Sequence, residues 1–144
     1  HSFARMLGTD PGFRTAGLVT LSMQNPPSVA TPAQRAALYR SLEERIAALP
    51  GVQGVAAVSR LPLMGVNLGT MIHIEGRTFA AGEQPEVEYR RSTPGYFATM
   101  GIPILQGRVF EERDSDPRSP VVVINEALAR KFFPGEDPVG RRIA

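Results

Sequence analysis

The sequence contains no cysteine and only two histidines. Without cysteine, disulfide bonds, thiol nucleophiles and zinc–thiolate sites are excluded. His1 stands at the terminus. His73 lies between Ile72 and Ile74 in a segment typical of a strand, where a packing or surface role is the usual one. No Gly-x-Ser-x-Gly motif presents a serine that His73 could activate. We therefore predict no catalytic residue, and an enzyme is the least favoured class of function.

Long apolar runs and lysine are scarce as well. No stretch approaches the roughly 18 consecutive apolar residues that a membrane-spanning helix needs. Of the 16 basic residues only Lys131 is a lysine, and the arginines are spread along the chain, with pairs only at residues 90–91 and 141–142. Proteins that bind nucleic acid usually carry a basic stripe beside stacking aromatic residues. The net charge of +2 therefore does not indicate a nucleic-acid partner.

What the sequence does contain is typical of one globular domain. Its 144 residues are 42% hydrophobic and 21% charged, close to the average of soluble proteins. Because there are 14 glycines and 13 prolines, we expect many turns and short elements.

The clearest element is a helix predicted over residues 31–49. Thr31 is a typical N-cap, Pro32 suits the first helical position, and Gln34 completes a capping box. Apolar residues then recur at helical spacing, at Leu38, Leu42, Ile46 and Leu49. A Pro-Gly pair follows and ends the helix. A helix with one apolar face must pack on a sheet or on another helix.

Segments of β-type sequence precede and follow this helix. Strands are predicted at residues 17–23, 52–59, 70–75, 86–93, 121–124 and 139–144. The segment 121–124 is expected to be buried. Shorter helices are predicted at residues 94–100 and 126–133, the second capped by Asn125. This order predicts an α+β fold: a small mixed sheet of βαβ type, porter-like or ferredoxin-like, with helices packed on one face and the sheet truncated at the C-terminal end.

Alternating charges on two predicted strands raise the question of a metal site. His73 and Glu75 share one strand face, and Glu86 and Glu88 share a face of another. Imidazole and carboxylate groups suit several divalent ions. Because such alternation is equally typical of any solvent-facing strand, we predict no metal site.

Two loops resemble ligand-binding motifs only in part. The run from Asp114 to Asp116 resembles the start of a calcium loop but lacks its central glycine and closing glutamate. Residues 135–142 have the glycine spacing of a phosphate-binding loop, but Arg141 and Arg142 stand where lysine and Ser/Thr are needed. We expect no cofactor.

One loop that is interrupted by proline and glycine is rich in apolar residues. These residues are Leu61, Leu63, Met64, Val66 and Leu68, and we call residues 61–68 the apolar loop. Two interpretations remain open: the side chains pack beneath the sheet, or they contact a partner protein or a small apolar ligand.

Several short motifs follow one another along the chain. In the first half they are residues 10–13 (DPGF), 48–52 (ALPGV) and 59–65 (SRLPLMG). In the second half they are residues 94–110 (PGYFATMGIPILQGRVF) followed by Asp114, 121–130 (VVVINEALAR) and 133–143 (FPGEDPVGRRI). Together, and in this order, they resemble the periplasmic core domain of MacB-like and FtsX-like ABC transporter permeases.

The motif residues are of types that shape a fold. Aromatic residues can anchor the short helix on the sheet, and glycine and proline permit the turns that flank it. The residues to which we assign such structural roles are Pro94, Tyr96, Phe97, Gly101, Gly107, Arg108, Phe110, Asn125, Pro134, Asp137, Pro138 and Gly140.

The resemblance implies a function that composition alone does not indicate. Such a domain lies between the first two transmembrane helices of a permease, on the periplasmic side of the inner membrane. Residues 1–15 would lead in from a transmembrane helix, and residues 16–144 would be part of the core domain. A separate ABC ATPase would hydrolyse ATP, while this domain, without catalysis or cofactor, transmits conformational change and docks a periplasmic adaptor or an export substrate.

One departure from the family concerns the end of the sequence. In the family the chain continues past the position of Ile143 into further strands, so we expect an open sheet edge through which this chain can dimerise. The alternative function is a free-standing module that binds an apolar ligand or a protein through the apolar loop.

Overall fold

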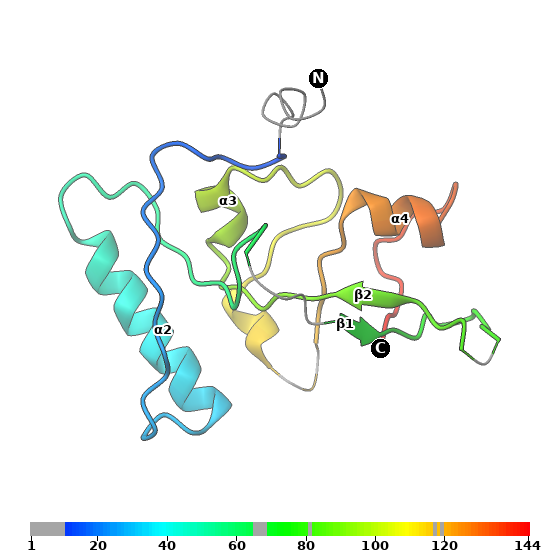
Figure 1. Ribbon diagram of the computed structural model, residues 1–144, viewed down its shortest axis with the longest axis horizontal. Coiled ribbons are helices and arrows are strands. Elements are labelled where there is room, and N and C mark those ends of the chain that lie inside the picture. The colour runs from blue at the N-terminus through cyan, green and yellow to red at the C-terminus, as the bar shows by residue number, and fades with distance from the viewer. Residues whose placement is uncertain (1–10, 65–68, 81, 117, 119) are drawn as a thin grey trace. The chain divides into compact units, whose positions relative to one another are not determined.

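The structure is a computed structural model that describes residues 11–64, 69–80, 82–116, 118 and 120–144. Its elements, in chain order, are helix α2 (Pro32–Ala47), strands β1 (Gly69–Met71) and β2 (Glu86–Glu88), helix α3 (Tyr96–Met100), the 3₁₀ helix η1 (Glu112–Ser115) and helix α4 (Glu126–Phe132) (Figure 1). The predicted α+β class is confirmed.

The chain forms two compact units. Unit 1 comprises His1–Ala57 and Gly95–Pro103, and unit 2 comprises Val58–Pro94 and Ile104–Ala144. Helices α2 and α3 belong to unit 1, whereas both strands, η1 and α4 belong to unit 2.

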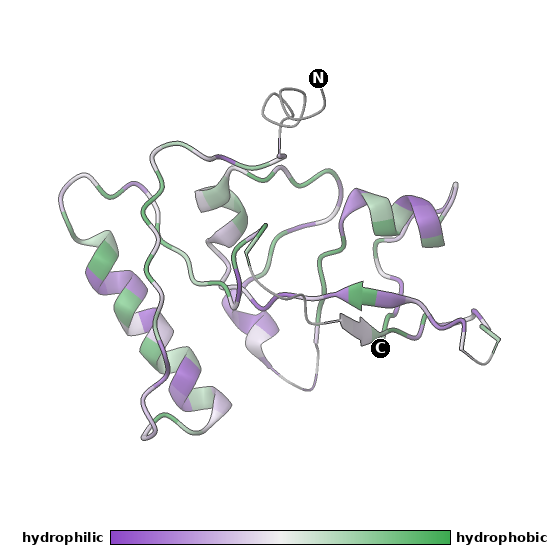
Figure 2. Cartoon of the chain, viewed as in Figure 1, coloured by the Kyte–Doolittle hydropathy of each residue, from purple (hydrophilic) through white to green (hydrophobic). Residues whose placement is uncertain are grey.

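In unit 1, α2 begins at the predicted capping box. The N–H of Gln34 donates to the Thr31 hydroxyl (3.2 Å), and the N–H of Thr31 donates to the Gln34 side-chain oxygen (2.9 Å). Apolar and polar residues alternate in bands along α2 (Figure 2), but no side chain of α2 is fully buried. The helix therefore depends strongly on its local cap.

Helix α3 forms the buried part of unit 1. Tyr96 and Met100 are its buried side chains, and the ring of Phe97 meets that of Tyr96 edge to face at 5.5 Å. Gly101 ends the helix in the left-handed region, with φ +66°, which glycine adopts without strain. The short helix predicted over residues 94–100 is confirmed.

Two strands predicted in unit 1 are not formed in the described part of the chain. Residues 17–23 run as an extended segment, and residues 52–57 form no strand. The predicted strand 52–59 has one isolated bridge, between Val58 and Ser92, and both of these residues belong to unit 2. A β-type sequence indicates only that a segment can pair, because each strand needs the backbone of another. The sheet is therefore smaller than predicted.

In unit 2, β1 and β2 pair antiparallel. Gly69 lies opposite Glu88, Thr70 opposite Val87 and Met71 opposite Glu86. The pairing is two-stranded and antiparallel, where a mixed sheet was predicted. Beyond β1, the chain also pairs with the C-terminal segment, through a bridge between Ile74 and Ile143. The predicted strands 70–75, 86–93 and 139–144 thus pair over part of their lengths.

The core of unit 2 lies between this pairing and α4. Ile72, Ile74 and Phe133 are buried, and a ring of half-buried side chains packs against them: Phe79, Val87, Ile124, Leu128, Phe132 and Ile143. Ile72 and Ile74 lie two residues apart in the segment that follows β1. Leu128 and Phe132 of α4 pack against this cluster.

Helix α4 is positioned by its cap. The N–H of Leu128 donates to the Asn125 side-chain oxygen at 2.8 Å, which confirms the predicted N-cap. The segment just before it corrects a prediction: residues 121–124 form no strand, and Val121 and Val122 are exposed. Their apolar character does not bury them, since no element of the described chain covers these two side chains.

Candidate functional site

The apolar loop is described up to Met64, and Val66 and Leu68 lie outside the described residues. Leu61 is half-buried, whereas the side chains of Leu63 and Met64 are 89% and 60% exposed. Packing beneath the sheet is therefore not observed for Leu63 and Met64. These two neighbouring side chains present an apolar surface to solvent.

The backbone at Leu63 is unusual. The N–H of Met64 donates to the carbonyl of Leu61 at 3.4 Å, which closes a turn around Pro62 and Leu63. Leu63 has φ 61°, and it is the one non-glycine residue of the described chain with positive φ. A leucine in this region costs about 1 kcal/mol. The turn thus holds an exposed leucine in a conformation that glycine would adopt more easily.

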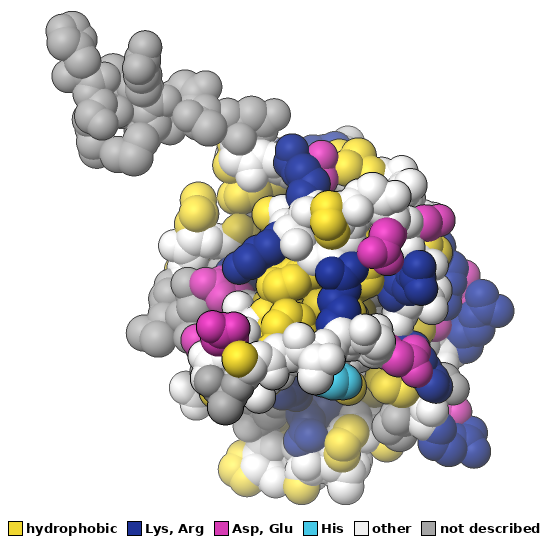
Figure 3. Space-filling view, turned by 90° about the vertical axis from the view of Figure 1, so that its right-hand side faces the viewer, with side chains coloured by type: hydrophobic (Ala, Val, Ile, Leu, Met, Phe, Trp, Pro, Cys, Tyr) yellow, Lys and Arg dark blue, Asp and Glu magenta, His cyan; other side chains and the backbone are white. Residues whose placement is uncertain are grey.

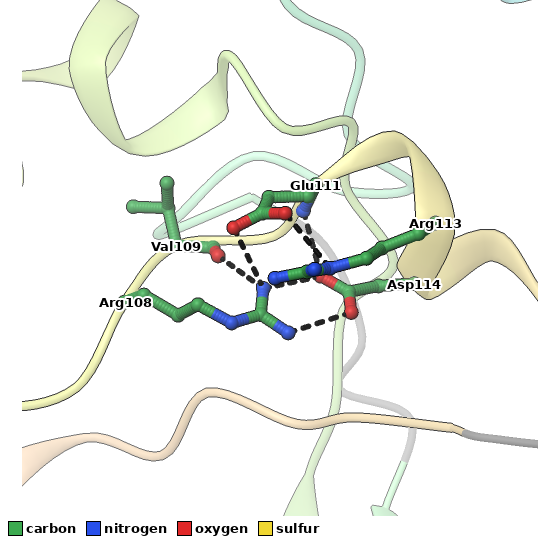
Figure 4. Close-up of polar contacts among 5 residues, drawn as sticks. All are labelled: Arg108, Val109, Glu111, Arg113 and Asp114. Atoms are coloured by element: carbon green, nitrogen blue, oxygen red, sulfur yellow. Dashed lines mark hydrogen bonds and ion pairs between the residues drawn. The ribbon is translucent and has the colours of Figure 1, made fainter.

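A compact set of ion pairs fixes the loop that follows α3 in the sequence (Figure 4). Both terminal nitrogens of Arg108 donate hydrogen bonds to the Asp114 carboxylate, at 2.6 and 2.8 Å. One of them also donates to the carbonyl of Val109 at 2.9 Å. The N–H of Glu111 donates to Asp114 at 2.7 Å, and Arg113 pairs with Glu111 at 2.8 Å. We call this arrangement the arginine clasp.

The electrostatics of the clasp follow from this geometry. The Asp114 side chain is only 8% exposed. The hydrogen bond from Arg108, followed by that from the Glu111 N–H, holds the pKa of Asp114 well below its ordinary value. The same hydrogen bond raises the pKa of Arg108. Both groups stay charged at neutral pH, so the clasp stabilises a fixed loop and has no proton to exchange there.

The structure also places the other motif residues. Tyr96, Phe97 and Gly101 shape α3 and its end, and Asn125 caps α4. The N–H of Val139 donates to Asp137 at 2.9 Å. Gly107 and Gly140 have positive φ, Pro94, Phe110 and Pro138 are half-buried, and Pro134 is exposed just after α4. Most of these positions lie at the ends of helices or in turns.

Two of the three carboxylates that raised the question of a metal site, Glu75 and Glu88, lie in ion pairs. Glu88 pairs with Arg90 at 3.4 Å, and Glu75 lies 3.8 Å from Arg142. His73 is exposed. Across the described residues, no group of three or more His, Asp or Glu side chains is arranged to hold a metal ion.

The two arginines of the phosphate-loop-like segment, Arg141 and Arg142, also form ion pairs. Arg141 pairs with Glu136 at 3.4 Å, and the same carboxylate pairs with Arg77 at 3.0 Å. Basic and acidic side chains are interspersed on the face drawn in Figure 3, with apolar side chains between them. On this face there is no extended stripe of one charge.

Comparison with known proteins identifies the family. The chain matches the family model of the MacB-like periplasmic core domain over residues 6–144. The chain belongs to this family. No curated protein and no solved structure matches it.

Membership places the chain in a transport protein. A MacB-like periplasmic core domain is the periplasmic part of an ABC transporter permease, which is an inner-membrane protein. In the described part of the chain, no helix is both long and apolar enough to cross a membrane.

Two features of this MacB-like domain were not evident in the sequence. The first is the strained turn at Leu63: Pro62 is a common turn residue, but the positive φ of the next position favours glycine or asparagine, so a leucine there gives no signal. The second is the ion pair of Arg108 and Asp114, which stand six residues apart. Residues at this spacing are not neighbours on a helix or along a strand, so only the path of the loop brings the two side chains together.

Proposed function

We propose that this MacB-like domain is a non-catalytic transmitter and docking element of its permease. Residues 1–15 would lead in from a transmembrane helix, residues 16–144 would form part of the core domain, and a separate ABC ATPase would hydrolyse ATP. The observation that carries the proposal is the family match over residues 6–144.

The docking element of this proposal is the apolar loop. Leu63 and Met64 together offer adjacent exposed apolar side chains on a turn whose backbone is already fixed. A fixed apolar side chain loses little conformational freedom on binding, so it is a good anchor for a partner's pocket. The strain at Leu63 is a cost to folding that burial against a periplasmic adaptor or export substrate would offset.

The proposal is tested by photo-crosslinking in the intact permease. A photoreactive amino acid replaces Leu63 in one variant and Leu105 in the other, because Leu105 is an exposed leucine of the same unit outside the loop. We expect a crosslinked periplasmic protein or substrate at position 63 and little or none at position 105. Equal crosslinking at both positions, or none at either, would contradict docking at this loop.

A second measurement tests transmission. Leu63→Ser should abolish most of the stimulation of ATP hydrolysis by the captured partner and leave the basal rate of the ATPase unchanged, whereas Leu105→Ser should change neither. Stimulation that survives Leu63→Ser would argue against coupling through this turn. If the isolated chain instead binds small apolar ligands in a thermal-shift screen, and Leu63→Ser removes that shift, the ligand-binding alternative is favoured.

A further inference from the structure

The apolar loop begins at a short antiparallel pairing within unit 2, where Val58 bridges to Ser92. The N–H of Ser59 donates to the carbonyl of Arg91 at 2.8 Å, and the N–H of Arg91 donates to the Ser59 hydroxyl at 3.0 Å. Arg60 follows Ser59 directly and precedes the first residue of the loop. The pairing thus places the backbone of two arginines at the base of the apolar loop. We call Arg60 and Arg91 the basic rim.

The basic rim differs from the other arginines of unit 2. Each of the others lies in an ion pair with an Asp or a Glu. Among the described residues, no carboxylate pairs with Arg60 or with Arg91. The Arg91 guanidinium lies instead over the ring of Tyr89, 5.9 Å from the ring centre. The described part of the chain therefore leaves the positive charge of the rim unneutralised.

Acidic residues are also scarce in the sequence around the loop. Residues 45–74 contain no Asp or Glu. On β2, Glu88 pairs with Arg90 at 3.4 Å, and the Glu86 side chain lies against Gly69, just after the loop. At about 0.1 M salt, exposed charges act on one another over about 10 Å. An acidic group that approaches the base of the loop is therefore attracted by the rim.

The chemistry of this surface favours carboxylates carried by a protein. A guanidinium presents a planar set of donors that matches the two oxygens of a carboxylate. Beside the rim, Leu63 and Met64 expose apolar side chains on a fixed turn. Anionic membrane surfaces are usually recognised by clusters of about four to eight basic residues, which is more than the rim supplies. The surface therefore fits an apolar side chain that is flanked by Asp or Glu.

From these observations we propose that the basic rim determines which partner docks at the apolar loop. The partner is a segment of a periplasmic protein in which an apolar residue packs on Leu63 and Met64 while neighbouring Asp or Glu residues pair with Arg60 and Arg91. This inference rests on the proposed function, because it describes the partner of the same loop. The apolar contact governs how long the complex lasts, and the rim charges govern how fast it forms and how strongly salt slows its formation.

The test uses the intact permease in membranes, with a photoreactive amino acid at position 63 and periplasmic extract of the same cells as the probe. Crosslinking is measured between about 0.01 M and about 1 M salt, over which the Debye length falls from about 30 Å to about 3 Å. We expect the yield at low salt to fall about five- to tenfold when Arg60→Gln and Arg91→Gln are combined. At high salt the two forms should crosslink about equally.

Two further variants separate charge from fold. Arg60→Lys combined with Arg91→Lys keeps both positive charges and should retain most of the salt-dependent yield. Arg130→Gln is the matched control, because Arg130 is an exposed arginine of the same unit that lies on α4, away from the loop in the sequence. It should leave the yield unchanged. Circular dichroism of the variants verifies that each retains its fold.

The identity of the crosslinked segment gives a second, independent readout. Mass spectrometry should locate the crosslink on an apolar residue that has Asp or Glu beside it. A synthetic peptide of that segment should bind the intact permease, and replacement of its Asp and Glu by Asn and Gln should slow association while changing the dissociation rate little.

Failure of this inference is distinguishable from failure of the proposed function. Absence of any crosslink at position 63 would contradict docking itself, and the inference would fall with it. A crosslinked protein whose yield ignores salt and the glutamine variants, or whose segment lacks Asp and Glu, would leave docking in place and overturn the role of the rim. A crosslink to an anionic lipid, or to another segment of the permease itself, would also overturn it.

Discussion

The two units of this MacB-like domain differ in what holds them together. In unit 2, strand pairing and α4 enclose the buried side chains of Ile72, Ile74 and Phe133. In unit 1, the long helix α2 buries no side chain fully, and the buried residues Tyr96 and Met100 lie on the short helix α3. Unit 1 thus relies on local helix signals, whereas unit 2 relies on contacts between segments distant in sequence.

This difference shows where the domain is open to partners. A segment whose backbone is paired has satisfied its hydrogen bonds and has little to offer another strand. In unit 2, β1 and β2 pair with each other, although residues 121–124 form no strand. In unit 1, residues 18–24 are extended and make no backbone hydrogen bond with another residue of the described ranges. The predictions below test the comparison between the units, beginning with the largest effect.

Truncation of a core isoleucine should show the largest difference in stability between the two units. Ile74 is 1% exposed, and Ile74→Ala should lower the free energy of unfolding by about 2–5 kcal/mol, since it removes buried methyl groups and leaves a cavity. The same truncation on α2, Ile46→Ala, should cost only about 1 kcal/mol because Ile46 is half-buried. Urea unfolding measures both. Equal losses would mean that α2 is as well packed as the core of unit 2.

Removal of the α2 cap should have a smaller and more local effect. Thr31→Ala removes the acceptor of the Gln34 N–H and should cost about 1 kcal/mol. Faster amide hydrogen exchange should appear in the first turns of α2, while α4 is unaffected. Ser28→Ala is the control, because the Ser28 hydroxyl has no partner among the described residues. Uniformly faster exchange throughout the chain would contradict a locally stabilised α2.

Disruption of the arginine clasp should lower the stability least, and the loss of stability should depend on pH. The pKa of Asp114 is lowered in the folded chain, so its contribution is complete at neutral pH and is lost as the pH falls below about 4, where the unfolded carboxyl becomes protonated. Asp114→Asn should therefore lower the urea midpoint at pH 7, and the difference from the native chain should shrink towards pH 2. The effect is modest because Arg108 is partly exposed and screened by salt.

Asp116→Asn provides a matched control for the clasp. Asp116 also pairs with an arginine, but that partner, Arg118, is almost fully exposed. We expect a smaller change in the urea midpoint and a weaker pH dependence. If Asp116→Asn equals Asp114→Asn, the clasp geometry adds nothing beyond an ordinary surface ion pair.

The helices could be predicted from the sequence to within a few residues. The capping box of Thr31 and Gln34 and the Asn125 cap are contacts between residues three apart, so their pattern is complete within a short window. The strands were predicted less well. Residues 17–23 and 121–124 have β-type sequences, but nothing within such a segment specifies whether another strand lies beside it.

Of the features of the candidate site, too, only some could be predicted from the sequence. The apolar loop and the family were evident from residue types and motif order. The positive φ of the exposed Leu63 and the ion pair between Arg108 and Asp114 were not evident, because both depend on the path of a loop backbone.

The sequence by itself determined the helices, their caps and the family of this domain, because a helix satisfies its hydrogen bonds within its own segment. Only the tertiary structure decided which β-type segments pair, and that Ile72 and Ile74 are buried with Phe133 in one core. The physical reason is that a strand completes its hydrogen bonds, and an apolar side chain its burial, only against residues that the fold brings from elsewhere in the chain.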